Sequence, residues 1–445
     1  MMRTRREVLR QVGAMAVLGT ITPWWLVRRA HAARREKLIV WMPVTQPPPV
    51  ETLLQEQCYA YAKQAGIPAH ELEYARIGLR EWLPKVMAAL EAGHPPDVTQ
   101  PMEKDHFSAA QAARFRGPQH LLDVTDLVET LQRTAGGFFP TSLQAVMDHG
   151  KAYGVPQAVS PWVLVTRLDL LETARVEPPT TWDAFIEVCQ RVQHPPQLTG
   201  YGMCLGLATD ADYNIMQMIW SDGGALVDAD EQTVTLQSPA TVQTVKRIAE
   251  MYQIQKIIPE AALSWDNQGN NKAYQARQAL FVLNTSGLYA GLAGSDRELQ
   301  QVTGMLPVPG GPAGAREALS TSEWILFKHN PYPDVAKGLV QYYMEPENLR
   351  AVMEAAGGRW GPPYPDMYTS DFWHQSGLAH WRAMVGRGRP FAAPGRMTGA
   401  AAEVLSTSLL ARMMHRVLVD HWEAEKAVED AHQQAVAIYA RYPEG

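Results

Sequence analysis

Short apolar runs alternate with amphipathic stretches along the first part of the chain after the N-terminal segment. Residues 37–41 have the pattern of a short buried strand, and residues 50–65 have the spacing of a helix. Strand-like runs at 71–77 and 97–100 flank a second helix, which ends at Gly93. This alternation predicts an α/β fold with a mostly parallel sheet covered by helices on both faces. In such sheets a ligand binds beyond the carboxyl ends of the strands.

The rest of the chain continues the alternation of strands and helices. A turn at 150–156 leads into a strand through 162–165, and Thr180 and Asp183 have the spacing of a capping box at a helix start. The other predicted strands are 200–207, 278–283, 305–308 and 324–327. The other predicted helices are 167–174, 213–220, 240–254, 334–344 and 403–440, the last as one long amphipathic helix.

The N-terminal segment has the features of an export signal. Arg5 and Arg6 precede an apolar stretch at 12–27, and a small-x-small cleavage site follows at 30–32. This segment resembles a twin-arginine signal, which directs folded proteins out of the cytoplasm. The alternative is a retained membrane anchor, but about 16 apolar residues are short for the roughly 20 of a spanning helix. We therefore expect residues 1–32 to be a cleaved signal peptide and the mature protein to work in the periplasm or another extracytoplasmic space.

The charge of the chain limits its partners. Beyond residue 32 the sequence has 34 Lys and Arg against 45 Asp and Glu, a formal net charge of −11. That acidity argues against nucleic acid or an anionic membrane as a partner. The roughly 410 remaining residues suggest two domains of ordinary size. The 13 Trp residues are numerous, as a site for flat apolar faces would require.

Motifs for covalent, metal or redox chemistry are missing from the sequence. There is no Gly-x-Ser-x-Gly, His-Glu-x-x-His or phosphate-binding loop, and no Cys-x-x-Cys pair. The three cysteines, Cys58, Cys189 and Cys204, fit apolar patterns and are expected to be buried thiols. We therefore expect no enzyme activity, no cofactor and no metal site.

An ordered set of short motifs spans nearly the whole chain and resembles the extracellular solute-binding proteins of sugar-type ABC importers, the maltose-binding-protein-like group. No single motif is specific, and the order and separation of the set carry the resemblance. The motifs are Trp82-Leu-Pro-Lys-Val86, Gly93-x-x-Pro96-Asp-Val98, Gly150-Lys-Ala-Tyr-Gly-Val-Pro156, Pro179-Thr-Thr-Trp-Asp-Ala-Phe185, Ser221-Asp-Gly-Gly224, Leu236-x-Ser-Pro-Ala240, Gln278-Ala-Leu-Phe281 and Asp334-x-Ala336.

The resemblance implies a two-lobed periplasmic-binding-protein fold of type II, with a hinge and a ligand cleft between the lobes. The lobes would close on a carbohydrate-like solute, and an ABC permease in the membrane would recognise the closed form. We expect a monomer. The implied lobes are 33–158 with 305–345 and 159–304 with 346–445, crossing near 157–161, 304–309 and 345–350.

A sugar site requires aromatic plates for the ring faces and polar side chains for the hydroxyl rim. Trp41, directly after the first predicted strand, is a candidate plate, although a core position is an equal alternative. Gln100 and Glu103 follow the third strand, where the family places polar contacts. Gln157 and Trp162 belong to the predicted hinge strand.

The remaining candidates come from the second half of the chain. Tyr213 matches a position where the family has a sugar-stacking aromatic residue, whereas Trp220 on the same helix has a core role as its stronger alternative. Arg359 could form a bidentate contact or a surface ion pair. The other candidates are Asn284, Tyr289, Ser322 and Trp360.

Two alternatives to a sugar receptor remain open from the residues. The same fold binds glycerol phosphodiesters, polyamines, iron, thiamine or peptides in relatives, and these ligands require different side chains in the cleft. A phosphate group would need Arg residues and helix N-termini. An exported glycoside-active enzyme would need two carboxylates across a cleft, and sequence alone does not pair them.

Overall fold

The computed structural model describes residues 37–44, 47–100, 120–375 and 377–442. The predicted signal peptide, residues 1–32, and Glu103 lie outside these ranges. Among the described helices, none is both long enough and apolar enough to cross a membrane.

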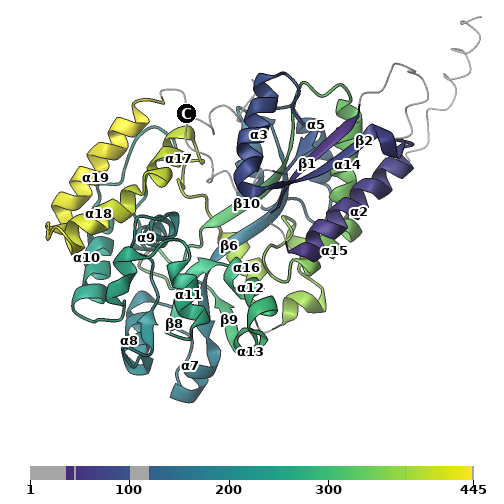
Figure 1. Ribbon diagram of the computed structural model, residues 1–445. Coiled ribbons are helices and arrows are strands. Elements are labelled where there is room, and N and C mark those ends of the chain that lie inside the picture. The colour runs from purple at the N-terminus through teal and green to yellow at the C-terminus, as the bar shows by residue number, and fades with distance from the viewer. Residues whose placement is uncertain (1–36, 45–46, 101–119, 376, 443–445) are drawn as a thin grey trace, which may run out of the picture. The chain divides into compact units, whose positions relative to one another are not determined.

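A single mixed β-sheet forms the centre of the structure (Figure 1). Its strand order is β2-β1-β3-β10-β6-β8-β7, and β9 also pairs with β6. The strands are β1 (Leu38–Val44), β2 (Leu72–Gly78), β3 (Val98–Thr99), β6 (Val155–Arg167), β7 (Thr199–Tyr201), β8 (Ala279–Thr285), β9 (Thr303–Leu306) and β10 (Leu319–Leu326).

The prediction of a mostly parallel sheet is correct only at its two ends. β1 pairs in parallel with β2 and β3, and β7 pairs in parallel with β8, as β–α–β units require. In the middle, β10 is antiparallel to β3 and β6, and β6 is antiparallel to β8 and β9. The central strands come from segments far apart in the chain, so no β–α–β crossover fixes their direction.

Strand β6 joins the two ends of the sheet. Its residues 155–161 pair with β10, and its residues 162–167 pair with β8 and β9. All 13 of its residues are buried, which explains its nearly continuous apolar sequence. One half of the sheet, β2-β1-β3-β10, therefore connects to the other half, β8-β7, through a single continuous strand.

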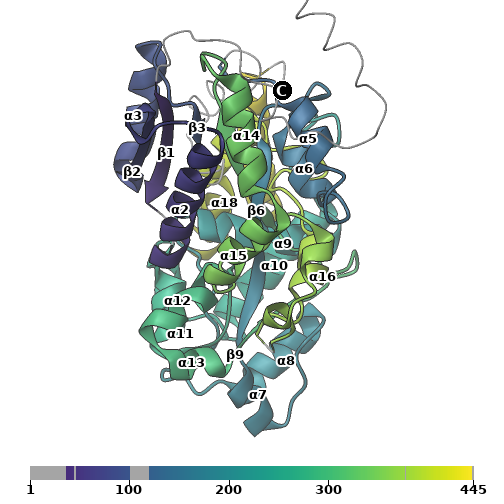
Figure 2. The same cartoon turned by 90° about the vertical axis from the view of Figure 1, so that its right-hand side faces the viewer.

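Two groups of helices pack around the two halves of the sheet (Figures 1 and 2). α2 (Pro48–Gln64) packs against α14 (Pro333–Tyr343) and α15 (Pro346–Ala355). α9 (Thr209–Asp222), α10 (Pro239–Gln253), α18 (Leu409–Leu418) and α19 (Ala424–Tyr439) pack together as the second group. The expected lobe boundaries, including the crossing near residues 345–350, stay a prediction.

Shorter helices and one hairpin complete the structure. The hairpin of β4 (Met147–Asp148) and β5 (Lys151–Ala152) follows α6. The helices are α3 (Leu79–Glu91), α5 (Thr125–Leu131), α6 (Pro140–Val146), α7 (Leu168–Ala174), α8 (Trp182–Val192), α11 (Gly269–Gln275), α12 (Gly287–Ser295), α13 (Arg297–Gln301), α16 (Trp381–Arg387) and α17 (Gly399–Ser406). Short 3₁₀ turns cover Ala69–Glu71, Glu260–Ser264, Pro365–Met367 and Asp371–His374.

Local backbone geometry corrects two helix predictions. The predicted helix 403–440 is three helices, because Ser408 and His421 adopt left-handed φ angles of 51° and 57° and interrupt it. At the start of α8 the cap is Thr181, one residue later than predicted, and its side chain accepts a hydrogen bond from the Ala184 amide.

The three cysteines confirm the prediction of buried thiols. Cys58, Cys189 and Cys204 are free and buried. Burial raises the pKa of the Cys58 and Cys204 thiols to about 12, and it also raises the pKa of Cys189. The protonated, inaccessible thiols are therefore inert structural groups.

Candidate functional site

A cavity of about 60 Å³ lies where three parts of the chain meet. α6 and the residue after it form one wall, the first residues of β10 form a second, and the segment from Pro390 to Met397 forms the third. The polar lining consists of Thr141, Gln144, Ser320, Thr321 and Arg396, and Phe391 contributes an aromatic ring. Hydroxyl and amide groups beside an aromatic ring form a chemically neutral, polar surface suited to a polyol.

Two residues of β10 that line this cavity have buried hydroxyl groups without partners among the described residues. Ser320 Oγ and Thr321 Oγ1 form no hydrogen bond within the described part of the chain. A buried hydroxyl without a partner costs about 1–3 kcal/mol, so native proteins rarely keep one without a reason. A solute whose own hydroxyls pair with these groups would remove that cost.

Three aromatic rings from separate elements contact one another, and one of them, Phe391, lines the cavity. Trp162 on β6 and Tyr213 on α9 have ring centroids 4.4 Å apart at an interplanar angle of 20°. Tyr213 meets Phe391 edge-on, with centroids 5.3 Å apart. The structure therefore brings together two residues predicted from the sequence, Trp162 and Tyr213, and adds Phe391, which sequence reasoning missed. Phe391 follows Pro390 in a loop with Gly388 and Pro394, and an aromatic residue in such a loop was the available signal.

A β-bulge directs the side chain of Gln157. Ser322 on β10 pairs with Ala158 and the next residue, Glu323, pairs with Pro156, so Gln157 is the extra residue on β6. A bulge redirects a side chain relative to the regular alternation. The buried amide of Gln100, at the end of β3, donates to Gln157 Oε1. These two predicted site residues therefore meet, and Ser322 lies buried beside them on β10.

Trp41 lies inside β1 rather than after it, which corrects the sequence-based placement. It is buried, its indole Nε1 donates to Glu73 Oε1 at 3.4 Å, and the Lys85 ammonium lies 4.5 Å from its ring centroid. Trp220, on α9, is also buried in the core of the second half. Both residues have the packing of core side chains.

The side chains of Asn284 and Tyr289 are held by contacts away from the cavity. Asn284 Nδ2 donates to Asp210 Oδ2 at 3.1 Å and to Asn271 Oδ1 at 2.7 Å, linking β8 to α9 and α11. Tyr289, on α12, packs against Gly358 and Gly377, and burial raises its pKa. Neither side chain is brought to the cavity lining.

Arg359 and Trp360 form a pair in the loop after α15. The guanidinium carbon lies 4.9 Å from the Trp360 ring centroid. The Arg359 carbonyl accepts a hydrogen bond from Ser286 Oγ at 2.8 Å, and Ser286 contacts Ser160 of β6 at 3.1 Å. The loop is thereby held against the middle of β6, close in sequence to Trp162.

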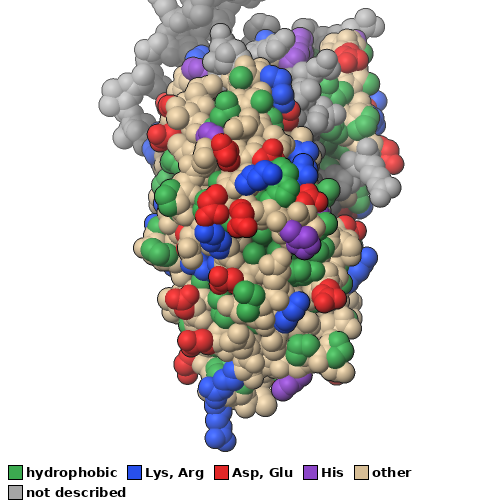
Figure 3. Space-filling model, turned by 90° about the vertical axis from the view of Figure 1, so that its left-hand side faces the viewer, with side chains coloured by type: hydrophobic (Ala, Val, Ile, Leu, Met, Phe, Trp, Pro, Cys, Tyr) green, Lys and Arg blue, Asp and Glu red, His purple; other side chains and the backbone are tan. Residues whose placement is uncertain are grey.

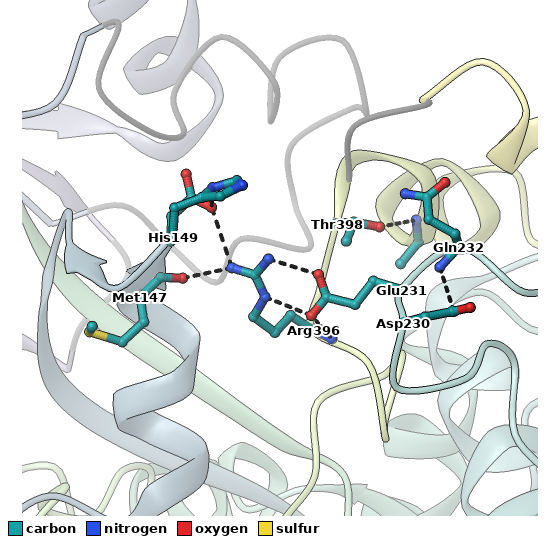
Figure 4. Close-up of polar contacts among 9 residues, drawn as sticks. Met147, His149, Asp230, Glu231, Gln232, Arg396 and Thr398 are labelled. Carbon is teal, nitrogen blue, oxygen red and sulfur yellow. Dashed lines mark hydrogen bonds and ion pairs between the residues drawn. The ribbon is translucent and has the colours of Figure 1, made fainter.

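Arg396 is a second residue of the cavity that sequence reasoning missed (Figure 4). Its Nε and Nη2 donate to the two carboxylate oxygens of Glu231 at 2.6 and 2.7 Å. Its Nη1 donates to the Met147 carbonyl at 3.1 Å and to Asp148 Oδ1 at 3.4 Å. Burial raises the pKa of Glu231, but the hydrogen bonds from Arg396 outweigh it and hold that pKa below its usual range. The positive charge at the cavity is therefore neutralised by two carboxylates.

The surface and the described side chains point to no other kind of chemistry. On the face in Figure 3, acidic and basic side chains are interspersed without a continuous basic area. A continuous basic area is what nucleic acid requires. No group of three His, Cys, Asp or Glu residues in the described ranges is arranged to hold a metal ion.

Comparison with known proteins identifies the family. Residues 56–380 match the family described as bacterial extracellular solute-binding protein. The chain belongs to this family. The resemblance found in the sequence motifs is thus confirmed.

Solved structures with the same architecture cover almost the whole chain. Maltose-bound MalE3 of T. maritima has a TM-score of 0.70 at 20% identity, covering 89% of this chain and 98% of that protein. The GacH receptor of Streptomyces glaucescens, solved unliganded and with acarbose, has a TM-score of 0.71 at 17% identity, covering 90% and 98%. A cyclo/maltodextrin-binding protein complexed with maltotetraose has a TM-score of 0.73 at 17% identity, covering 93% and 99%. These likenesses confirm the predicted two-lobed α/β fold of the maltose-binding-protein-like group.

Proposed function

We propose that this solute-binding protein is the carbohydrate receptor of an ABC importer and captures its solute between two lobes by hinge closure. The observation that carries the proposal is the cavity lined by Phe391 and by Ser320 and Thr321, whose buried hydroxyls have no hydrogen-bond partner in the described part of the chain. Sugar hydroxyls supply hydrogen-bond partners for Ser320 and Thr321, and the apolar face of a sugar ring packs against the Phe391 ring. The ligands named for the three similar structures, maltose, acarbose and maltotetraose, are carbohydrates.

The size of the cavity supports a moving hinge. At about 60 Å³ it is several-fold smaller than the roughly 300–1,000 Å³ of small-molecule sites. Admitting a sugar therefore requires its walls to separate. β6 is the continuous strand between the two halves of the sheet, and its segment 157–161 is the proposed first crossing. A solute can shift the equilibrium between the open and closed forms only by the difference between its binding free energies for the two forms.

The proposal includes the route and the partners of the protein. Export through the twin-arginine pathway is supported by Arg5, Arg6 and the small-x-small site at 30–32. A membrane permease would recognise the closed form, and a separate cytoplasmic ATPase would supply the energy for transport. We propose that the chain acts as a monomer and performs no covalent step.

A thermal-shift screen tests the proposed ligand class. The protein is heated with maltose, maltotetraose, other neutral sugars, a glycerol phosphodiester, a polyamine or an iron chelate. A ligand at a hundredfold excess over its Kd stabilises the folded state by about 2.7 kcal/mol. We expect the melting temperature to rise with one class of neutral sugar. A rise only with the phosphodiester, the polyamine or the chelate would overturn the carbohydrate assignment.

A further inference from the structure

Arg396 is anchored to the half of the structure that contains α9, α10 and α19. Its guanidinium makes a two-pronged ion pair with Glu231, and its backbone amide donates to Glu231 Oε1 at 3.1 Å. The neighbouring Gly395 is packed so closely that a Cβ atom there would lie 3.1 Å from Val227 Cγ1. The loop of Glu231 is closed by a bridge between Val227 and Val234. The arginine is therefore part of this half.

The other contacts of Arg396 lie on the β4–β5 hairpin, which belongs to the opposite half. The amide of Val124, just before α5, donates to the Ala152 carbonyl at 2.9 Å. Lys151 pairs with Asp123 at 2.8 Å. The hairpin is thus fixed to the segment that runs beside β10 through the bridge between Leu121 and Phe327. Figure 4 shows the guanidinium between Met147 of the hairpin and Glu231.

We propose that Arg396 is a clasp that spans the cavity and favours the closed arrangement of the two halves. This proposal takes one element from the proposed function, namely that the solute enters between these two halves. Glu231 holds the guanidinium rigidly through two parallel hydrogen bonds, which is the geometry that arginine provides and lysine does not. The remaining Nη1 then reaches the Met147 carbonyl and Asp148, so each closing motion forms these contacts and each opening motion breaks them.

The clasp also explains why a cationic residue lies in a cavity suited to neutral solutes. The charge of Arg396 is directed to Glu231 and Asp148, and Asp148 also contacts His149 at 2.9 Å. The arginine therefore acts on the solute indirectly, as a positioning residue that sets how long the closed form persists. Added salt weakens partly exposed ion pairs, so it should loosen the clasp.

The test measures the distance between the two halves without any sugar. Glu129→Cys on α5 and Glu429→Cys on α19 place spin labels at exposed positions of opposite halves, and the three buried native thiols stay unlabelled. Double electron–electron resonance then gives the distribution of distances. We expect Arg396→Gln to lower the ratio of closed to open molecules about tenfold. In the protein with Arg396 intact, 1 M NaCl should lower the same ratio.

Control variants separate the clasp from a general loss of charge or of folding. Arg416→Gln removes an exposed pair with Asp420 within one half and should leave the distribution unchanged. Asp148→Ala should cause a smaller shift, and adding it to Arg396→Gln should change nothing further, because both act through one contact. If Arg396→Gln does not fold, Asp148→Ala carries the test. Distributions identical to the parent protein in both variants would overturn the clasp.

The kinetics of sugar release distinguish failure of the clasp from failure of the proposed function. With maltotetraose as the probe, Arg396→Gln should release the sugar about tenfold faster, because the closed form is less populated. Unchanged release together with unchanged distances would contradict the clasp alone. A parent protein that binds no sugar while its distances still respond to Arg396→Gln would contradict the proposed ligand and support the clasp.

Discussion

Replacing Arg247 with Met is expected to lower the free energy of unfolding by about 3–5 kcal/mol, the cost of leaving a buried charge without its partner. Asp222, the last residue of α9, has only 3% of its side chain exposed. Arg247 Nη1 donates to both of its carboxylate oxygens at 2.8 and 2.7 Å, and Thr244 Oγ1 donates at 2.6 Å. Without Arg247, the Thr244 hydroxyl would be the one side-chain donor left to this carboxylate among the residues that the structure describes.

The measurement is chemical denaturation followed by circular dichroism. Arg416→Gln, which removes an exposed i,i+4 pair, is the matched control and should cost less than about 0.5 kcal/mol. Adding Asp222→Asn to Arg247→Met removes the buried charge and should restore much of the lost stability. Equal stability of Arg247→Met and the control would mean that the Asp222 pair does not hold α9 against α10.

Replacing Tyr213 with Ala is expected to weaken sugar binding about 5- to 30-fold, because one lost aromatic contact is worth roughly 1–2 kcal/mol. Tyr213 lies between Trp162 and Phe391, so truncation removes the support of the ring that lines the cavity. The sequence predicted Tyr213 as a plate facing the solute. In the structure it is 4% exposed and packs edge-on against Phe391.

Truncation of a buried ring also costs stability, so affinity must be measured on the folded fraction. Tyr59→Ala removes an exposed ring of α2 and should leave both affinity and stability near those of the parent protein. Direct titration of the folded variants with maltotetraose provides the comparison. Unchanged affinity in Tyr213→Ala would place the sugar site away from Phe391.

The sequence predicts those parts of the fold that follow from local periodicity. β1, β2 and β3 with their connecting helices match the predicted β–α–β pattern, because apolar periodicity and Gly and Pro signals are local. The breaks at Ser408 and His421 were missed because neither residue is the glycine that usually marks a left-handed turn. The antiparallel centre of the sheet depends on pairing between distant segments, which a pattern along the chain does not contain.

For the candidate site, the sequence indicates individual side chains of a suitable type but not the long-range contacts that they make. Trp162 and Tyr213 became candidates because aromatic residues at a predicted hinge strand and helix are visible in the sequence, and the structure stacks their rings on each other. Gln157 meets Gln100 only because of a bulge, and Arg396 meets Glu231 across 165 residues. The amide of Asn284 on β8 was a plausible ligand by type, but its partners, the buried Asp210 and the half-buried Asn271, come from two helices. Long-range contacts decide all three cases.

Calorimetric titration with maltose, maltotetraose and other neutral sugars tests the central claim most directly. A carbohydrate receptor should give one saturable site per chain with one sugar class, and Ser320→Ala with Thr321→Val should weaken that binding by removing the hydroxyls that pair with it. Saturable binding of a glycerol phosphodiester or a polyamine, with no heat from any neutral sugar, would contradict the claim.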